Sequence, residues 1–214
     1  GRIMADNFAV LYPKSFMDSK EIEQIRHAAT VLDGSIRPIT FSIGRYIVDD
    51  LTLSVSAMYD RASLAEASVK GRYDRQVGLY NESMREHLLH EQQIVSEMHD
   101  ALANGQFELW FQPQYNLVSG ALVGSEALVR WRRAKDGRLI APGEFIPVFE
   151  RNGFIYELDK YVWEQACALL RRWMDSGREA LPISVNVSRY DVFREDFYEI
   201  ITGLIGKYAL PIGL

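Results

Sequence analysis

An acid and a base, Glu126 and Arg130, lie four residues apart in the apolar stretch SEALVRW. On a helix they would touch and form an ordinary surface ion pair. On a strand they would share one face about 13 Å apart, at about 3.3 Å per residue, which is too far for a salt bridge. A strand would therefore leave a carboxylate and a guanidinium to find other partners.

Three more polar residues, Ser184, Asn186 and Ser188, alternate with aliphatic ones in the stretch LPISVNVS. Parallel strands covered on both faces usually read as unbroken apolar runs, and an unpaired buried polar atom costs about 1–3 kcal/mol. Such side chains therefore imply partners. Carboxylate and amide oxygens suit Mg²⁺, Mn²⁺ or Ca²⁺, and an arginine suits a phosphate. The alternative is an edge strand whose polar face is solvated.

A β-hairpin is predicted around the first pair. Residues 107–116 and 121–131 are rich in β-branched and aromatic residues and flank a Ser-Gly turn. The hairpin favours the strand interpretation, in which Glu126, Leu128 and Arg130 share one face and the residues that alternate with them share the other.

The other expected elements also follow from periodicity and turn residues. Downstream, helices over 156–175 and 190–208 flank a strand over 181–188, and this alternation is typical of a parallel α/β sheet or barrel. Upstream, we expect a hairpin around Ala5-Asp6-Asn7, then a helix over 19–32, a strand over 38–48 and a helix over 51–71.

A long polar helix is predicted over residues 81–104. Its apolar residues form a near-heptad stripe that Glu91 interrupts: Met84, Leu88, Val95, Met98 and Leu102. The stripe indicates a connector that packs one face on its neighbours, and a partner-binding coiled coil is the alternative. Three histidines, His87, His90 and His99, lie in this helix, but the intervening glutamates are explained by a solvated face, and we expect no metal site there.

The composition is that of an ordinary globular protein, with 214 residues, 48% hydrophobic and 25% charged. A net charge of −5, from 24 basic and 29 acidic residues, argues against a nonspecific nucleic-acid binder. The single cysteine, Cys167, can form no internal disulfide, which suits a reducing cytosol. No apolar run approaches the roughly 18 residues that span a bilayer, so we expect a cytoplasmic chain, which an upstream segment could still anchor to a membrane.

Several segments between about residues 102 and 214 carry a family resemblance: FQPQYN, GALVGSEALVRWRR, GRLIAPGEFIPVFERNGFI, LDKYVWEQACALLRRW and LPISVNVS. Together and in this order they resemble the EAL domain of bacterial cyclic-di-GMP phosphodiesterases. The name motif of that family matches Glu126-Ala127-Leu128. The resemblance implies a TIM-like (β/α) barrel that hydrolyses cyclic di-GMP with two Mg²⁺ or Mn²⁺ ions and an activated water.

The resemblance also implies roles for individual residues. Glu126 and Asn186 would bind metal, and Gln112, Leu128 and Arg130 would contact the dinucleotide. These roles agree with the chemistry of the side chains, which offer oxygen ligands to a cation and a guanidinium to a phosphate.

The first part of the chain resembles the second half of a GGDEF domain, the diguanylate cyclase fold that often precedes an EAL domain. The segment GRIMADNF stands at the signature hairpin, where Asp6 and Phe8 are retained. Met4 and Ala5 replace the two glycines that let the backbone approach the nucleotide, and Asn7 replaces the catalytic glutamate. The resemblance therefore implies a degenerate domain without cyclase activity.

The implied order of parts is a cyclase-like α+β domain over 1–80, a linker helix over 81–104 and the first part of an EAL barrel over 105–214. In the family, further metal ligands and the base lie beyond the position that matches Leu214. No catalytic set is then complete, and we expect no turnover of cyclic di-GMP by this chain. The parent protein is expected to be a phosphodiesterase, or alternatively a catalytically dead receptor or protein-interaction module. Expected partners are cyclic di-GMP and, through the linker helix or the EAL domain, a second copy or another protein.

Overall fold

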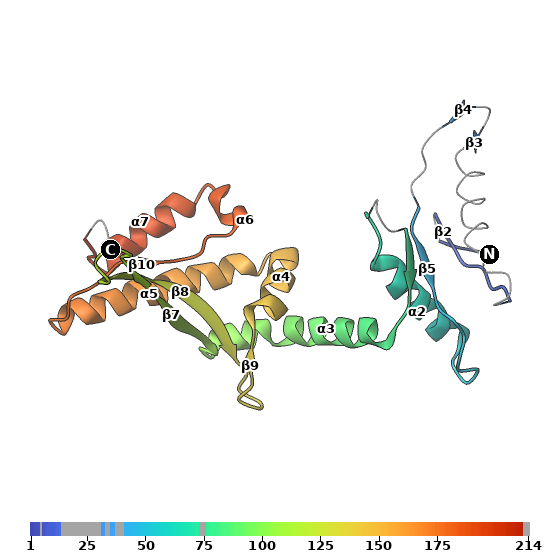
Figure 1. Cartoon of the computed structure of the whole chain (residues 1–214), viewed down its shortest axis with the longest axis horizontal. Coiled ribbons are helices and arrows are strands. Elements are labelled where there is room, and N and C mark those ends of the chain that lie inside the picture. Colours follow the sequence, from blue (N-terminus) through green and yellow to red (C-terminus); the bar gives the residue numbers. More distant parts are fainter. Residues whose placement is uncertain (5, 14–30, 33–34, 37–40, 73–75, 212–214) are drawn as a thin grey trace. The chain divides into compact units, whose positions relative to one another are not determined.

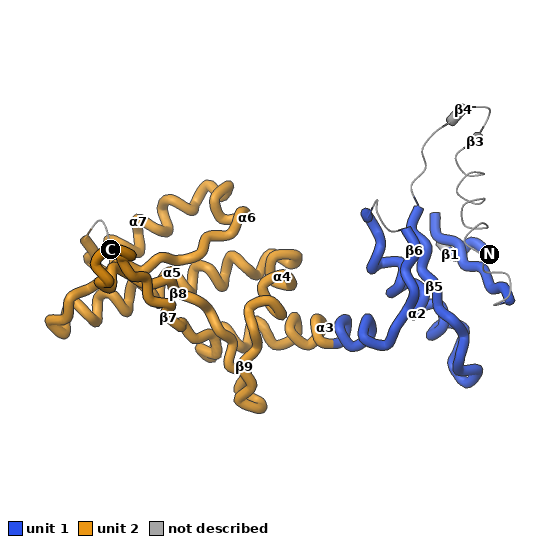
Figure 2. The backbone as a smooth tube through the Cα atoms, in the orientation of Figure 1, with its two compact units in different colours: residues 1–89 blue, residues 90–214 orange. Residues whose placement is uncertain are grey.

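The structure is a computed structural model of the chain, and it describes residues 1–4, 6–13, 31–32, 35–36, 41–72 and 76–211. The chain divides into two compact units, Gly1–Leu89 (unit 1) and His90–Leu214 (unit 2), which Figure 2 shows in different colours. Each unit has its own strands and helices (Figure 1). In the described part of the chain, no helix combines the length and the apolar character that a membrane span needs.

Unit 1 begins with the hairpin predicted around residues 5–7. Strand β1 (Arg2–Met4) pairs antiparallel with β2 (Asn7–Phe8), and the register is irregular between Arg2 and Met4. The ends are closed by a hydrogen bond from the Ala9 amide to the Gly1 carbonyl at 2.9 Å. The hairpin is confirmed for the described residues, which do not include residue 5.

Two further predictions for unit 1 fall partly outside the described residues. Most of the helix expected over 19–32 lies there, and its end is wrong, because Val31–Leu32 is strand β3, paired with β4 (Ser35–Ile36). The strand expected over 38–48 is confirmed in its centre as β5 (Ile43–Arg45).

Glycine lets two strands lie directly against a helix in unit 1. Helix α2 (Val55–Ala67) is the one predicted over 51–71, whereas β6 (Val77–Leu79), parallel to β5, was not predicted. A Cβ at Gly44 would lie 1.9 Å from a carbonyl oxygen of α2, and one at Gly78 would lie 2.0 Å from another. Only a residue without a side chain permits this packing.

Unit 2 is built on a sheet with the strand order β10-β8-β7, in which β9 pairs with β8 (Figure 1). The strands are β7 (Phe107–Tyr115), β8 (Leu122–Arg132), β9 (Leu139–Ile140) and β10 (Ile183–Ser184). β7 and β8 form the predicted antiparallel hairpin, and β10 runs parallel to β8. The strand predicted over 181–188 is thus shorter than expected.

One face of this sheet packs into an aromatic core. Phe107 and Trp131 stand opposite each other in the register and are 2% and 0% exposed. With Phe145, Phe149 and Phe154 they form a cluster whose neighbouring ring centroids lie 4.8–6.1 Å apart. Such ring pairs add about 0.5–1.5 kcal/mol each beyond their buried area, so this cluster strongly specifies which face of the sheet is inside.

Four helices follow the hairpin: α4 (Pro142–Asn152), α5 (Ile155–Asp175), α6 (Arg189–Val192) and α7 (Phe197–Lys207). α5 is the helix predicted over 156–175, and α4 was not predicted. The prediction of a single helix over 190–208 is wrong, because the helix is interrupted between α6 and α7.

Contacts with α5 stabilise the segment between α6 and α7. The Arg194 guanidinium lies 3.8 Å from the ring centroid of Tyr156, and the Tyr156 hydroxyl donates to Asp196 Oδ2 at 2.6 Å. Arg194 Nε also donates to Asp196 Oδ1 at 3.1 Å. Because Tyr156 is distant in sequence, helical periodicity alone did not reveal the break.

Helix α3 (Glu82–Ala103) is the long helix predicted over 81–104. Its buried residues are Ile94, Met98 and Ala101. Leu88 and Val95 are 37% and 41% exposed, so the predicted stripe is wrong at these two residues. These buried residues belong to the aromatic core of unit 2. The part of α3 from residue 90 onward is therefore packed as an integral element of that unit.

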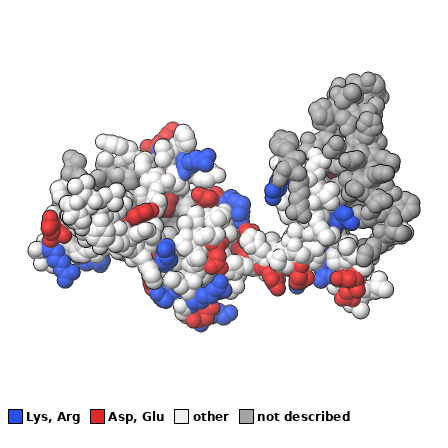
Figure 3. Space-filling view, viewed as in Figure 1, with Lys and Arg blue, Asp and Glu red and all other residues white. Residues whose placement is uncertain are grey.

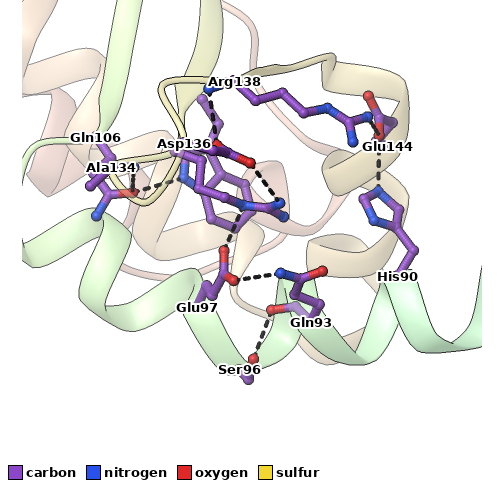
Figure 4. A network of polar contacts seen from close by, with 11 residues as sticks. His90, Gln93, Ser96, Glu97, Gln106, Ala134, Asp136, Arg138 and Glu144 are labelled. Carbon is purple, nitrogen blue, oxygen red and sulfur yellow. Dashed lines mark hydrogen bonds and ion pairs between the residues drawn. The ribbon is translucent and has the colours of Figure 1, made fainter.

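Polar contacts also join α3 to α4, as Figure 4 shows. His90 Nε2 lies 2.9 Å from Glu144 Oε2, and Arg138 Nη2 donates to the same oxygen at 3.1 Å. The other oxygen of Glu144 accepts a hydrogen bond from the Ala141 amide at 3.1 Å, at the start of α4. One glutamate thus ties together the helix start, the loop after β8 and the linker helix.

A buried cation joins α3 to the end of β8. Arg133 is 6% exposed, and its Nε lies 2.8 Å from Glu97 Oε2. The approach is oblique, because Nε and Nη2 have no aligned hydrogen-bond acceptor among the described residues. Gln93 Nε2 orients the carboxylate by donating to Glu97 Oε1 at 2.9 Å (Figure 4), and Asp136 Oδ2 lies 3.8 Å from Arg133 Nη1.

Two buried carboxyl groups meet between α5 and α6. Asp159 is 9% exposed and Asp191 is fully buried. Asp191 Oδ2 accepts hydrogen bonds from Ser188 N at 3.0 Å and from Ser188 Oγ at 2.5 Å. Among the described residues, no N–H group or hydroxyl donates to the buried Oδ1. Burial, followed by the hydrogen bond to Asp191 and its negative charge, raises the pKa of Asp159 from 3.8 to about 8. Asp159 therefore carries a proton at neutral pH and can donate it to Asp191.

Replacing Glu97 by Gln should destabilise unit 2, because the buried Arg133 guanidinium would lose its nearest negative charge. We expect the free energy of unfolding to fall by about 1–3 kcal/mol. Urea unfolding followed by tryptophan fluorescence measures this unit, because all four tryptophans of the chain lie in it. The control is Glu86→Gln, which changes an exposed glutamate of the same helix. Equal effects of the two substitutions would contradict the role of the buried pair.

The proton of Asp159 should make the stability of unit 2 depend on pH. The folded protein keeps this proton up to about pH 8, whereas the carboxyl group of an unfolded chain loses it near its ordinary pKa of 3.8. The stabilisation from the protonated form is therefore complete at acidic pH below that ordinary value and is lost as the pH rises through about 8. Asp191 and Glu150 are the acidic groups that face Asp159.

Asp159→Asn keeps a hydrogen-bond donor toward Asp191 and cannot ionise. Relative to wild type, its free energy of unfolding should rise with pH by up to about 1.4 kcal/mol per pH unit between the two pKa values. Urea unfolding at a series of pH values measures this difference. Asp100→Asn, at an exposed position of α3, should leave the dependence unchanged. Parallel stability curves for wild type and Asp159→Asn would refute the protonated pair.

Candidate functional site

The candidate site residues of strand β8 lie on the face of the sheet that is turned away from the aromatic core. Glu126, Leu128 and Arg130 are half-buried on this face. Ala127 and Trp131, which alternate with them, are 2% and 0% exposed on the core side. The strand predicted for this segment and the assignment of its two faces are therefore confirmed.

Glu126 lies at the centre of the polar face, between two neighbouring strands. In the register it stands opposite Gln112 of β7 and Ser184 of β10. Asn186 follows β10 and turns its amide toward the carboxylate, so that Nδ2 donates to Glu126 Oε1 at 3.1 Å. Two residues that are 60 positions apart in the chain are thus brought together.

β10 can lie beside β8 because Gly124 has no side chain. A Cβ at this position would lie 2.9 Å from the Pro182 carbonyl oxygen, to which the Ser125 amide donates at 3.0 Å. Beyond the strand, Ser188 does not share the polar face as predicted. It is the N-cap of α6, and its Oγ accepts a hydrogen bond from the Asp191 amide at 3.2 Å.

Arg130 offers a positive charge on the same face. Its guanidinium lies 5.9 Å from the ring centroid of Trp110, and Nη1 donates to the Val129 carbonyl at 2.9 Å. Glu108 stands opposite Arg130 in the register, but its carboxylate pairs with Arg132, whose Nε lies 2.5 Å from Oε1. Among the described residues Arg130 forms no ion pair, so its charge is available to an anion.

The Glu108 carboxylate is fixed in its own pair. Arg132 Nη2 donates to Oε2 at 3.1 Å, and Trp110 Nε1 donates to the same oxygen at 3.2 Å. The hydrogen bond from Arg132 and then the one from Trp110 lower the pKa of Glu108. The Glu108 carboxylate is therefore already paired with Arg132 and does not neutralise Arg130.

Gln112 and Leu128 complete the predicted set. Gln112 is exposed and stands opposite Glu126, while Leu128 is half-buried and stands opposite Trp110. The face thus carries an amide, a carboxylate and a guanidinium around one apolar contact.

The carboxylate of Glu126 and the amide of Asn186 together fit a hard divalent cation. Both can supply oxygen ligands, which Mg²⁺ and Mn²⁺ prefer. The amide presents Nδ2 to the carboxylate here, and a half-turn would present its oxygen at the same place. Two protein ligands leave the other positions of an octahedron to water or phosphate oxygens.

Charged side chains are mixed over the visible surface of unit 2. In Figure 3, Lys and Arg lie interspersed with Asp and Glu on the face shown. A net charge of −5 gives no general attraction for anions. Recognition of an anion at this face would therefore depend on the local charge of Arg130 and on a bound cation.

Sequence analysis missed two tryptophans that touch this set. Trp110 could have been found, because it alternates with Gln112 along β7 and residues two apart share a face. Trp163 donates its indole N–H to the Asn186 carbonyl at 3.1 Å. No local pattern connects these two positions, because they lie in different elements.

The other residues singled out in the sequence lie elsewhere. Asp6 is exposed in the turn of the unit 1 hairpin, Met4 ends β1, and Asn7 and Phe8 form β2, where the Phe8 side chain is 69% exposed; Ala5 lies outside the described residues.

Two of the three histidines of α3, His90 and His99, have partners within unit 2. His90 contacts Glu144, and the His99 ring lies 4.8 Å from that of Phe154. Within the described ranges, no three His, Cys, Asp or Glu side chains converge as a metal site would require.

Comparison with known proteins places this arrangement in a family. The sequence profile of the EAL domain matches residues 95–212. Over 119 residues the chain is 37% identical to an uncharacterized protein of Mycobacterium tuberculosis, covering 55% of this chain and 38% of that protein. Over 131 residues it is 34% identical to MucR of Pseudomonas aeruginosa, a bifunctional diguanylate cyclase/cyclic di-GMP phosphodiesterase, covering 61% and 19% respectively.

A solved structure agrees with these matches. The MucR phosphodiesterase in complex with cyclic di-GMP gives a TM-score of 0.51 at 30% identity, over 55% of this chain and 47% of that chain. The chain spans 38% and 19% of the lengths of the two curated relatives. Because the family profile covers residues 95–212, more than half of the 214 residues, the chain belongs to the EAL domain family.

Proposed function

We propose that this chain is part of a cyclic-di-GMP signalling protein, and that the polar face of its unit 2 sheet binds the dinucleotide together with a divalent cation. The observation that carries this proposal is the 3.1 Å hydrogen bond from Asn186 Nδ2 to Glu126 Oε1, which brings the side-chain amide of the loop after β10 to the carboxylate of β8. Membership of the EAL family supports it, since the relative MucR is named for cyclic di-GMP phosphodiesterase activity.

Each residue of the face has a proposed role. Glu126 and Asn186 hold Mg²⁺ or Mn²⁺, and the cation neutralises phosphate charge and polarises the phosphodiester when bound. Arg130 binds a phosphate with its planar fork, which is not engaged by a carboxylate in the described structure. Gln112 offers amide hydrogen bonds and Leu128 an apolar contact to the nucleotide.

We further propose that unit 1 derives from a diguanylate cyclase (GGDEF) domain that no longer makes cyclic di-GMP. Asn7 stands where the motif of that family has an acid, and Met4 and Ala5 stand where it has glycines. The proposed parts remain residues 1–80, 81–104 and 105–214. The packing of α3 adds the part of the linker helix from residue 90 onward to the core of the EAL part.

The parent protein is proposed to be a phosphodiesterase, and a catalytically dead receptor is the second candidate. The replaced cyclase motif, with Met4, Ala5 and Asn7, supports this candidate because it indicates that the protein tolerates the loss of a catalytic set. A protein-interaction module is the remaining alternative. Nucleotide binding separates it from the other two, and product formation separates the phosphodiesterase from the receptor.

The 214-residue chain should bind cyclic di-GMP without converting it. We expect no linear dinucleotide after incubation with Mg²⁺ or Mn²⁺, because two ligands form a weak metal site and the described residues place no base beside it. Chromatography of the reaction mixture measures the product. Steady release of linear dinucleotide would show that the chain carries a complete catalytic set and would overturn the assignment of an incomplete one.

Glu126→Gln should abolish the effect of the cation on nucleotide binding, because a neutral amide replaces a charged ligand. We expect Mn²⁺ to strengthen the binding of cyclic di-GMP to the wild type. In the variant this strengthening should be at least about tenfold smaller, as measured by calorimetric titration. The control is Glu179→Gln, at an exposed position before β10, which should behave as wild type. Unchanged Mn²⁺ dependence in Glu126→Gln would remove the proposed role.

A further inference from the structure

The position of Asn186 is not set by the sheet. The ladder between β10 and β8 contains the pairs Ile183 with Ser125 and Ser184 with Glu126, and it ends before Asn186. The backbone of Asn186 therefore needs other partners if its amide is to stay beside the carboxylate.

Trp163 supplies one such partner from α5. Its side chain is 1% exposed in the core, and its ring packs edge-on against Phe197 with the centroids 5.6 Å apart. An indole can only donate a hydrogen bond, and the Nε1–H of Trp163 is directed to the Asn186 carbonyl at 3.1 Å. A rigid, buried donor thus holds the backbone of Asn186.

A second anchor follows two residues later. Ser188 donates from both its amide and its hydroxyl to Asp191 Oδ2, and the Asp191 amide donates back to Ser188 Oγ at 3.2 Å. Asp191 is itself buried against Asp159 of α5. The segment that carries Asn186 is therefore attached to α5 directly through Trp163 and indirectly through this reciprocal cap.

We propose that Trp163 is a positioning residue for Asn186, and that the cap formed by Ser188 and Asp191 is its second anchor. The two anchors keep the Asn186 amide at hydrogen-bonding distance from Glu126, so that both side chains can reach one cation without reordering the loop. The inference deepens the proposed function, since it concerns the same metal-binding pair. A buried indole N–H usually finds an acceptor, and here the acceptor is the backbone of the loop that carries Asn186.

The test compares two Trp→Phe substitutions on the same helix in the full chain. Trp163→Phe keeps an aromatic ring in the core and removes the N–H that reaches Asn186. Trp173→Phe is the matched control, because the ring centroids of Trp173 and Phe111 lie 6.4 Å apart and, among the described residues, the indole N–H of Trp173 donates no hydrogen bond to the Asn186 loop. Ser188→Ala tests the second anchor separately. Urea unfolding confirms that each variant is folded at the temperature of the assay.

The first measurement uses no ligand. Hydrogen–deuterium exchange of the peptide over residues 184–190 should be several-fold faster in Trp163→Phe and in Ser188→Ala than in wild type. Trp173→Phe should leave this peptide unchanged even where it lowers overall stability. Unchanged exchange of the peptide in Trp163→Phe would overturn the proposal.

The second measurement is the affinity for Mn²⁺ alone, followed by calorimetry. Trp163→Phe should raise the dissociation constant about tenfold, as the loss of a ligand's supporting hydrogen bond does in metal sites, and Trp173→Phe should not. Equal affinities of wild type and Trp163→Phe would overturn the positioning role. If the wild type binds no Mn²⁺, the proposed function fails, and the exchange measurement alone decides whether Trp163 orders the loop.

Discussion

The register of β8 is the constraint on which the polar face of this protein depends. Successive side chains of a strand point to opposite faces, so the burial of Ala127 and Trp131 in the core turns Glu126 and Arg130 to the other side. A slip of one residue would drive the acid and the base into the aromatic cluster. The same hydrophobic contacts that stabilise unit 2 therefore orient its candidate metal ligand and the arginine that we propose binds phosphate.

Beyond the end of the β8–β10 ladder, polar contacts fix the chain. The loop after β10 is ordered by a buried indole and a reciprocal cap, and the cap depends on two adjacent buried carboxyl groups, Asp159 and Asp191. Two ionised carboxylates in such a place would repel each other, and the raised pKa of Asp159 avoids this by keeping one proton. Order in the candidate site thus comes from two different sources, apolar packing under the strand and hydrogen bonds under the loop.

The elements that could be predicted are those whose signal is local. The β7–β8 hairpin and α5 show their periods of two and 3.6 within a short window, and the structure has them where expected. The break between α6 and α7 depends on Tyr156, and β6 depends on a close approach to α2. For α3, the helix was evident, but the choice of Ile94 over Val95 as the buried residue was set by the position of the aromatic core.

Residue types and strand periodicity were enough to predict the chemical groups of the candidate site, the strand face that carries Glu126 and Arg130, and the family resemblance, which the profile match confirms. The contacts of these residues followed from the packing of the elements. Glu108 forms its ion pair with Arg132 and not with Arg130. Asn186 donates a hydrogen bond to Glu126, and the Trp163 indole donates one to the backbone carbonyl of Asn186. The physical reason is that strand and helix periodicity arises between neighbours along the chain. A contact between residues 60 positions apart depends on how every element between them packs.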